Sequence, residues 1–443
     1  MHRTITAILA TFALLAAAVA AYGYNPPGGG TLLQADPNQP NAHGTIALRG
    51  LQVLQGDGKA NIAAWYQGYT QYLLNGTRQA DTSGGEFSIA GQAVPKNSFT
   101  HFYNPNTSKG FVLVIDEYNA IIGGISFLSL APWKYMTLKG PNPSMADMAD
   151  WYYAQAVKAM RAGSKSTALE YLGYALHYVS DATVPQHVTD EGAQKPGSKH
   201  CEYEAACDTA TAQAGFPHAG SGGLYKPDSW TPGDYIKDAA NSSKNLIANA
   251  KNPQTYVSVC NQMAPLAERY CAGLLDRFYR LWEAETFRVV VVTIDRVKAM
   301  TYWTPGRSLD SPDQADLYAY VTIDGRQYET GVVDGCDDMS PNALIPYAWV
   351  FPKWISGTKA KAEVKVAIWD DDGITGDDKA YICPKKNEKE LWMDYDLATG
   401  AVSKDTSASA SSTSPAITTS VHTKGNHGSG DEAEIWLTIQ RWP

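Results

Sequence analysis

The spacing of apolar residues changes near Glu285, and this change limits the fold of the 443-residue chain more than any other feature. Before it, apolar residues recur every three or four positions, as in a helix; one such stripe comprises Leu169, Leu172, Leu176 and Val179. After it, they alternate with polar residues, as in a strand; one such run contains Val364, Val366 and Ile368. The sequence predicts a multidomain α-then-β protein, with a helical domain over residues 22–285 and an all-β domain over residues 286–443.

Three helices of the first domain can be outlined from their end signals. Ser144 and Gly163 bound one helical stretch, and a long helix is expected over residues 256–285. Between them, Thr167 and Glu170 have the spacing of a capping box, so we expect a helix to begin there.

The first 21 residues have the pattern of an export signal. A short basic start is followed by an apolar core over residues 5–19 and by the small cleavage motif Ala18-Val19-Ala20. Cleavage is expected to leave Ala21 or Tyr22 at the start of the mature chain. No later stretch is long and uncharged enough to span a bilayer. We therefore expect a secreted or periplasmic protein.

The charge and the cysteine content of the chain bear on its partners and on its disulfides. The chain has 36 basic and 45 acidic residues, a formal charge of −9, which argues against a nucleic-acid partner held by phosphate neutralisation. Six cysteines in an exported chain predict three disulfides. Fifteen connectivities are possible, and chain order favours the local pairs Cys201–Cys207, Cys260–Cys271 and Cys336–Cys383. Cys201, next to His200, is an alternative metal ligand.

Histidines and carboxylates occur together in one short part of the helical region. His177 and Asp181 are four residues apart, and so are His200 and Glu204, which puts each pair on one helix face. His187 lies between the pairs, just after a proline. A single histidine on a helix is most often a core or surface residue. Two pairs and a fifth candidate within 28 residues instead predict a site for divalent metal.

These residues resemble a motif of the zinc-dependent bacterial phospholipases C, the family of clostridial alpha-toxin. The family pattern is His-Tyr-x-x-Asp, then Pro-x-His, then His-x-x-x-Glu, and the five residues above fill it. The segment 98–107, which contains His101-Phe102-Tyr103, is similar to a second family segment, and Asn41-Ala42-His43-Gly44 is similar to the family's first histidine. The resemblance extends over about residues 40–285.

The resemblance implies a cluster of three zinc ions in an all-α domain. One ion would be held by Asp81, His101, His177 and Asp181; a second by His187, His200 and Glu204; and the third by His43 together with a bridging Asp181. Asp81 would also be the catalytic carboxylate, with Glu86 as the competing position. In the family the mature N-terminus completes one site, and here Ala21 or Tyr22 would have to do so.

The implied activity is hydrolysis of phospholipids to diacylglycerol and a phosphorylated head group, by a monomer that binds membranes peripherally. The alternative is a zinc-dependent single-strand nuclease of the same fold. Those nucleases lack the His-Phe-Tyr-x-Pro segment, which this chain has at His101, and the acidic charge also disfavours them. A non-enzymatic membrane-binding protein would follow only from an incomplete zinc site.

Five aspartates of the second domain are spaced as in a C2-type calcium- and lipid-binding domain. They are Asp310, Asp316, Asp370, Asp372 and Asp378. In that family, carboxylates from two loops at one end of the sheet bind calcium, which requires six to eight oxygen ligands. The resemblance thus implies that the second domain is an antiparallel, C2-like β-sandwich, which attaches to membranes when calcium binds. The simpler interpretation is two solvated acidic loops.

Overall fold

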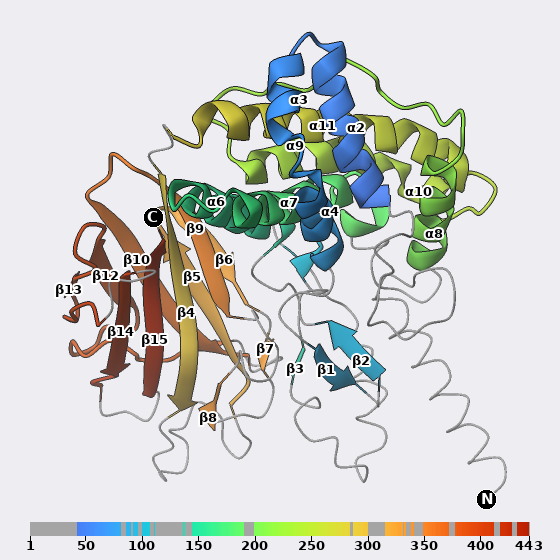
Figure 1. Cartoon of the computed structure of the whole chain (residues 1–443). Helices are drawn as coiled ribbons and strands as arrows, with labels where there is room; N and C mark the ends of the chain where they lie inside the picture. The colour runs from blue at the N-terminus through green and yellow to red at the C-terminus, as the bar shows by residue number, and fades with distance from the viewer. Residues whose placement is uncertain are drawn as a thin grey trace, which may run out of the picture. The chain divides into compact units, whose positions relative to one another are not determined.

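The computed structural model describes two compact units (Figure 1). The first combines Met1–Gly110 with Ser144–Glu285, and the second combines Phe111–Pro143 with Thr286–Pro443. The residues that the structure describes are 42–80, 86–89, 92–95, 100–106, 110, 136–137, 144–189, 199–283, 287–299, 315–330, 332–333, 338–340, 349–371, 377–411, 417–427 and 432–442. The export signal, Asp81, Asp310 and Asp372 lie outside them. Among the described helices, none is long and apolar enough to cross a membrane.

The first unit is helical, with one small hairpin. Its elements in chain order are α2 (Ala42–Gly56), α3 (Ala60–Tyr66), α4 (Thr70–Gln79), β1 (Glu86–Ile89), β2 (Gln92–Pro95), α6 (Met145–Arg161), α7 (Lys165–Asp181), η3 (Pro185–His187), α8 (His200–Thr211), α9 (Pro232–Ser243), η4 (Lys244–Leu246), α10 (Ile247–Ala250) and α11 (Tyr256–Leu281). The centre of the unit is α7, which packs against α2, α4, α6, α9 and α11. Every residue of α7 from Leu172 to Asp181 is buried, as expected of a helix surrounded by others.

The predicted helix ends are partly confirmed. Ser144 begins α6 with a capping box, in which its side chain and that of Asp147 satisfy free amides of the first turn. The box predicted at Thr167 is wrong, because α7 already begins at Lys165 after Ser164. There the Ser164 hydroxyl donates to the Thr167 hydroxyl instead, at 2.9 Å.

Two glycines let α4 and α7 approach each other backbone to backbone. A Cβ atom at Gly173 would lie 2.3 Å from the Leu73 carbonyl oxygen, and one at Gly76 would lie 2.0 Å from the Glu170 carbonyl oxygen. Both distances are far below van der Waals contact, so neither position accommodates a side chain without backbone movement. This contact sets the register between α4 and the face of α7 that carries His177.

The second unit consists of two antiparallel sheets. The larger has the order β13-β12-β10-β5-β7-β3, with β11 paired to β10 and β6 to β5; the smaller has the order β14-β15-β4-β8, with β9 paired to β4. Their bounds are β3 (Met136–Thr137), β4 (Phe287–Ala299), β5 (Leu317–Ile323), β6 (Arg326–Glu329), β7 (Val332–Val333), β8 (Asp338–Met339), β9 (Val350–Ser356), β10 (Lys361–Asp370), β11 (Asp378–Lys379), β12 (Leu391–Asp396), β13 (Val402–Lys404), β14 (Ile417–Lys424) and β15 (Ala433–Trp442). Helices followed by antiparallel strands were the predicted fold class, and this is confirmed.

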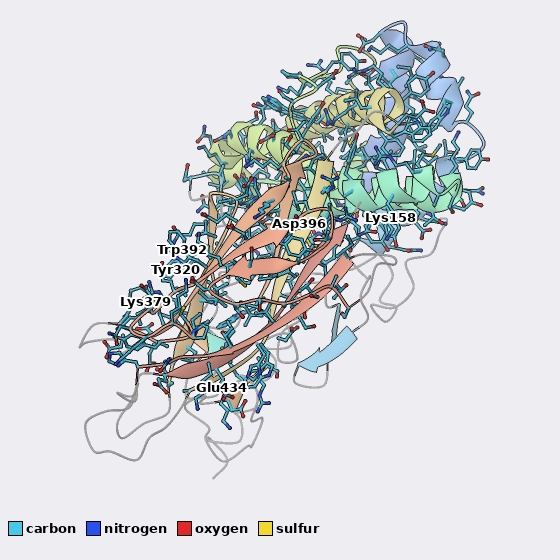
Figure 2. The ribbon with its side chains drawn as sticks, turned by 90° about the vertical axis from the view of Figure 1, so that its left-hand side faces the viewer. Lys158, Tyr320, Lys379, Trp392, Asp396 and Glu434 are labelled. Carbon is cyan, nitrogen blue, oxygen red and sulfur yellow. The ribbon has the colours of Figure 1, made fainter. Side chains whose placement is uncertain are left out.

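The alternating pattern of the strands separates a buried from a solvated face. In β10, Val364, Val366 and Ile368 are fully buried, while Lys361 and Glu363 are exposed. On the solvated face, aromatic rings lie beside lysines, and Tyr320, Lys379 and Trp392 can be followed in Figure 2. Lys404 lies 4.2 Å from the centre of the Trp392 ring and Lys365 lies 4.8 Å from it. Such lysine stems cover apolar ring surface while their ammonium groups stay in water.

Each of the three predicted disulfides includes a cysteine that the structure describes as free, so none of them is formed; Cys336 and the side chain of Cys201 lie outside the described part of the chain. Cys207, Cys260, Cys271 and Cys383 are all free thiols. Cys260 and Cys271 both lie in α11, where eleven residues correspond to about 16 Å of rise. Cys201 and Cys207 both lie in α8, about 9 Å apart along its axis. A disulfide requires Cα atoms within about 7 Å, so local pairing along a helix was the wrong inference from chain order.

Candidate metal centre

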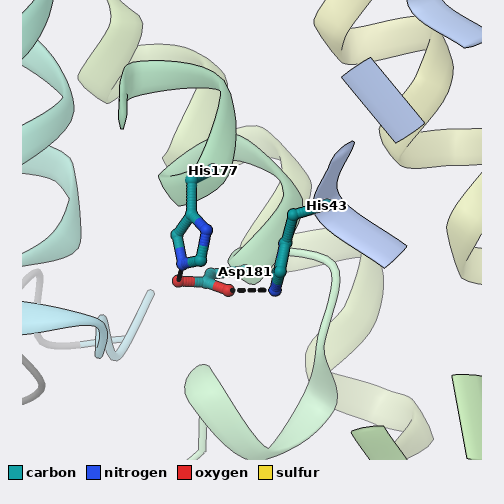
Figure 3. A group of neighbouring side chains, drawn as sticks. All are labelled: His43, His177 and Asp181. Carbon is teal, nitrogen blue, oxygen red and sulfur yellow. Dashed lines mark ion pairs between the residues drawn. The ribbon is translucent and has the colours of Figure 1, made fainter. Parts of the chain in front are cut away.

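The C-terminal turn of α7 and the first turn of α2 form one group of possible metal ligands, namely His43, His177 and Asp181 (Figure 3). His177 Nε2 lies 3.1 Å from Asp181 Oδ2, and His43 Nε2 lies 3.5 Å from Asp181 Oδ1. Asp181 thus presents one carboxylate oxygen to each imidazole. The centroids of the His43 and His177 rings are 4.0 Å apart, with the ring planes tilted by 34°. All three residues are inaccessible or nearly so, which requires their polar atoms to be satisfied within the site.

His101 joins this group from a different part of the chain. Its Nδ1 atom lies 2.7 Å from Asp181 Oδ2 and 3.2 Å from His177 Nε2. The segment around it is fixed by backbone hydrogen bonds: the Tyr103 amide donates to the His187 carbonyl, and the Met145 amide donates to the Phe102 carbonyl. Asp181 is therefore approached by three histidines from three separate segments.

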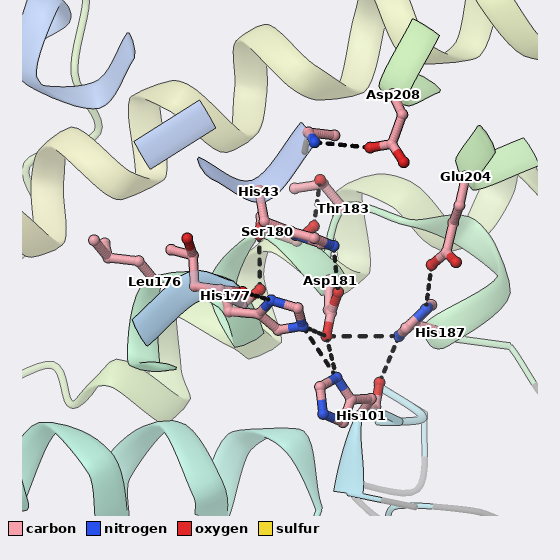
Figure 4. Close-up of polar contacts among 12 residues, drawn as sticks. His43, His101, Leu176, His177, Ser180, Asp181, Thr183, His187, Glu204 and Asp208 are labelled. Carbon is pink, nitrogen blue, oxygen red and sulfur yellow. Dashed lines mark hydrogen bonds and ion pairs between the residues drawn. The ribbon is translucent and has the colours of Figure 1, made fainter. Parts of the chain in front are cut away.

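His187, His200 and Glu204 form the second group. The Nε2 atoms of His187 and His200 are 2.6 Å apart, and each lies 2.9 Å from Glu204 Oε1. Proline at the start of η3 ends the helical path after α7 and turns His187 toward α8, which supplies the other two residues at i, i+4 spacing. His187 Nδ1 is also 3.8 Å from Asp181 Oδ2, so the two groups are adjacent (Figure 4).

Backbone and hydroxyl acceptors set the orientation of the imidazoles. His177 Nδ1 donates to the Thr77 carbonyl and His187 Nδ1 donates to the His101 carbonyl, both at 2.7 Å. The Ser180 hydroxyl donates to the His177 carbonyl, so it accepts from His43 Nδ1 at 2.6 Å. In all three histidines the Nδ1 proton is thereby engaged, and Nε2 is directed at the carboxylates. This is the arrangement that holds metal-binding histidines in one tautomer.

Three residues that support the site were missed at the sequence level. Thr77 contributes only a carbonyl, which has no sequence signature, and Ser180 is one small residue among many. Asp208 lies one turn beyond Glu204 in α8, and its Oδ1 accepts from the Ala42 amide at 2.7 Å. A carboxylate at a helix start satisfies a free amide and favours the helix dipole. The spacing Glu204-x-x-x-Asp208 was the available signal for it.

The electrostatics of the site couple its acids to its histidines. Burial alone would raise the pKa of Asp181, but His177 and His187 hold it well below its usual range. Burial would likewise raise the pKa of Glu204, which His200 and His187 instead lower strongly. Burial would lower the pKa of His187, yet Asp181 and Glu204 raise it to about 9. The carboxylates therefore remain ionised, and a cation is favoured between them.

The chemistry of these donors fits zinc. Neutral imidazole nitrogens and carboxylate oxygens are its ordinary protein ligands, usually four around each ion. Here two imidazole nitrogens converge on one oxygen of Glu204, and two more, together with His101, converge on the carboxylate of Asp181. Each group provides three or four donors.

The helical unit is similar in sequence to a known protein family. Residues 42–257 match the model of the zinc-dependent phospholipase C family. The helical unit belongs to this family. The matched segment contains both groups of ligands, so the prediction of a phospholipase C, and therefore of an enzyme, is confirmed.

Solved structures resemble the chain more distantly. Alpha-toxin from Clostridium absonum covers 82% of this chain and 99% of its own, at 14% identity and a TM-score of 0.44. Clostridium perfringens alpha-toxin covers 82% and 97%, at 15% identity and a TM-score of 0.41. A C2 domain protein from Ramazzottius varieornatus covers 35% and 88%, at 13% identity and a TM-score of 0.24. None of the curated proteins compared matches the chain.

The catalytic carboxylate of this phospholipase C domain was predicted to be Asp81, with Glu86 as competitor. Asp81 lies outside the described residues, and only the backbone of Glu86, in β1, is described. The neighbouring chain does reach the site. Helix α4 ends at Gln79, and Thr77 in its last turn accepts the hydrogen bond from His177. The assignment of Asp81 stays a prediction.

Of the five predicted calcium ligands, three are described. Asp370, at the end of β10, is fully buried and its Oδ1 accepts from the Asp316 amide at 2.7 Å. Asp378 in β11 is directly opposite Asp370 in the strand register, and it is exposed. The backbone thus gathers the three at one end of the larger sheet. Their carboxylates do not converge as a metal-binding group; among the described residues, both such groups are in the helical unit.

Proposed function

We propose that this protein is a secreted zinc phospholipase C that cleaves the glycerol-side phosphodiester bond of phospholipids, releasing diacylglycerol and a phosphorylated head group. The observation that carries the proposal is the adjacency of the two ligand groups, linked by Asp181 and His187 at 3.8 Å. Adjacent metal sites are the recurrent solution for phosphoester hydrolysis, because they act on both sides of one phosphorus atom.

His43, His101, His177 and Asp181 would hold zinc at one side of the site, and His187, His200 and Glu204 at the other. When bound, zinc supplies Lewis-acid stabilisation of phosphoryl oxygens and acidifies water. The chain's own contribution is to keep these donors in place before substrate arrives. The Thr77 and His101 carbonyls and the Ser180 hydroxyl fix the imidazole rings, so little reorganisation is needed during the reaction.

Proton transfer is assigned to Asp81, in its role as catalytic base. Asp181 and Glu204 are poor candidates for this role, since neighbouring histidines hold the pKa of both carboxyl groups far below the range in which they would accept a proton. Asp81 follows the helix that contacts His177, which is the support for placing it beside the same group. A base must come within hydrogen-bond reach of the proton that it accepts.

For the second unit we propose calcium-assisted attachment to phospholipid membranes. The support is the position of Asp316, Asp370 and Asp378 at one end of the larger sheet. Calcium bound there with Asp310 and Asp372 would offset the local negative charge and allow the loops to meet lipid head groups. The chain would then present its phospholipase C domain to lipid as a monomer.

The test is hydrolysis of phosphatidylcholine vesicles and of a soluble phosphodiester substrate by the purified full chain. A zinc-selective chelator should abolish both activities, and added zinc should restore them. Selective calcium removal should reduce only vesicle hydrolysis. Single-stranded DNA serves as the comparison substrate. Cleavage of DNA in preference to lipid, or lipid hydrolysis that survives zinc removal, would overturn the proposal.

A further inference from the structure

The thiols of Cys207 and Cys260 meet where α8 packs against α11. The Cys260 thiol donates to the Cys207 main-chain carbonyl at 3.9 Å, across 53 positions of sequence, and the Cys260 side chain is close enough to raise the pKa of the Cys207 thiol. Both side chains line the same small pocket, about 40 Å³ in volume. The other buried thiol of α11, Cys271, instead points to the Leu176 carbonyl.

We propose that Cys207 and Cys260 form a disulfide that cross-links α8 to α11. A small-molecule disulfide such as oxidised glutathione is the oxidant. One cysteine thiolate attacks it, forms a mixed disulfide and releases one small thiolate; the second cysteine thiolate then attacks the protein sulfur and releases the other. Two protein thiols are oxidised to one disulfide, and the external disulfide is reduced to two thiols, which take up the two protons.

The surroundings suit a neutral cross-link. Cys207 packs against an apolar cluster that comprises Tyr203, Ala250, Tyr256, Val259 and Met263. Burial and the Cys260 thiol raise the pKa of Cys207 well above its usual range, which disfavours metal binding by this cysteine and makes exchange with the external disulfide slow, so the incubation must be long. A disulfide carries no charge and needs no hydrogen-bond partner. The pocket beside both side chains leaves their sulfur atoms room to turn toward each other.

The cross-link would be made next to the metal ligands. Cys207 lies in the turn of α8 that follows Glu204, and the next residue, Asp208, holds the Ala42 amide at the start of α2. Helix α8 therefore carries Glu204 itself and, through Asp208, also holds the start of α2, the helix that carries His43. Attaching α8 to the long helix α11 would restrict its movement when zinc is removed. Zinc extraction should be slower from the oxidised protein than from the reduced protein, by about tenfold.

Peptide mapping of the full chain tests the pairing without reference to lipid hydrolysis, so it stands or fails separately from the proposed function. The protein is incubated with oxidised glutathione near pH 8.5, alkylated, unfolded and digested with trypsin. Because Lys226 precedes a proline, Cys207 falls in the peptide 200–237, while Cys260 falls in 252–269 and Cys271 in 270–277. We expect a linkage between 200–237 and 252–269. Since 200–237 also contains Cys201, the linkage must persist in Cys201→Ser.

The linkage should be lost in Cys207→Ser and in Cys260→Ser, and kept in Cys271→Ser, which removes an equally buried thiol from the same helix. Reduction of the wild type should lower its Tm by about 10 °C, and reduction of Cys260→Ser should not. Free thiols at both positions after this treatment, or pairing of Cys260 with another cysteine, would overturn the proposal. If a variant fails to fold, the peptide map of the wild-type protein decides whether the two cysteines are linked.

Discussion

The helical unit and the β unit hold their candidate metal ligands in contrasting ways. Asp181 is fully buried, and His43, His101 and His177, which come from three separate segments, are directed at its two oxygens. Asp370 is equally buried, but one of its oxygens accepts from the backbone of Asp316, and its strand neighbour Asp378 is exposed. The first site is organised by the fold itself, whereas the second would be completed only by an ion. Metal removal should therefore affect the two units differently.

Asp181→Asn should have the largest effect. It removes the charge that the site's histidines surround, so zinc content should fall and phospholipase C turnover should drop by about 10³-fold or more. Metal analysis and activity on a soluble substrate measure both. The matched control is Asp228→Asn, which removes an exposed carboxylate of the same unit. Zinc content and turnover at wild-type levels in Asp181→Asn would contradict the site.

Gly173→Ala tests whether helix packing builds the zinc site. The new methyl group would lie 2.3 Å from the Leu73 carbonyl oxygen, and a backbone atom cannot rotate away. We expect the free energy of unfolding to fall by about 3 kcal/mol, with weaker zinc binding because the Thr77–His177 hydrogen bond crosses the same contact. Denaturant unfolding with and without zinc measures this. Thr167→Ala, on the exposed first turn of α7, is the control and should change little.

These contacts show where sequence reasoning succeeded and where it stopped. The pairs His177–Asp181 and His200–Glu204 follow from helical spacing, and the change from helices to strands follows from periodicity. The approach of His43 to Ser180, 137 positions away, depends on the three-dimensional packing of α2 against α7. The Thr77 carbonyl has no side-chain signal at all. The pairings Cys201–Cys207 and Cys260–Cys271 failed because they ignored helix geometry, in which residues a few turns apart on one helix are too far from each other for a disulfide.

A third prediction concerns pH in the chelator-treated protein. Folding raises the pKa of His187 to about 9, from about 6.5 in the unfolded chain. The raised pKa contributes about 3 kcal/mol to the free energy of unfolding. This contribution is fully present below pH 6.5 and is lost as the pH rises through 9. The depressed pKa of Asp181 acts only at acid pH and does not affect this window.

Zinc should reverse that trend, because zinc replaces the proton on His187 and protons compete less as the pH rises. Denaturant unfolding at pH 6.5, 7.5 and 9 should show falling stability without zinc and constant or rising stability with it. Equal slopes in the two series would mean that His187 does not bind the metal. We expect no such difference in pH dependence with and without metal for the β unit, because its candidate calcium ligands are all carboxylates.

The smallest expected effect belongs to Asp370→Asn in the β unit. The amide retains an oxygen that can accept from the Asp316 amide, as Asp370 Oδ1 does, so the strands should stay paired while one negative charge is lost. Calcium-dependent vesicle binding should weaken about tenfold, and hydrolysis of a soluble substrate should be unchanged. Asp394→Asn, which removes a half-exposed carboxylate from β12 of the same sheet, is the matched control. If both variants bind vesicles equally, the acidic strand ends are solvated surface. The helical unit then has a metal site and the β unit does not. If only Asp370→Asn is impaired, the buried aspartate is the fixed ligand around which calcium gathers the exposed ones.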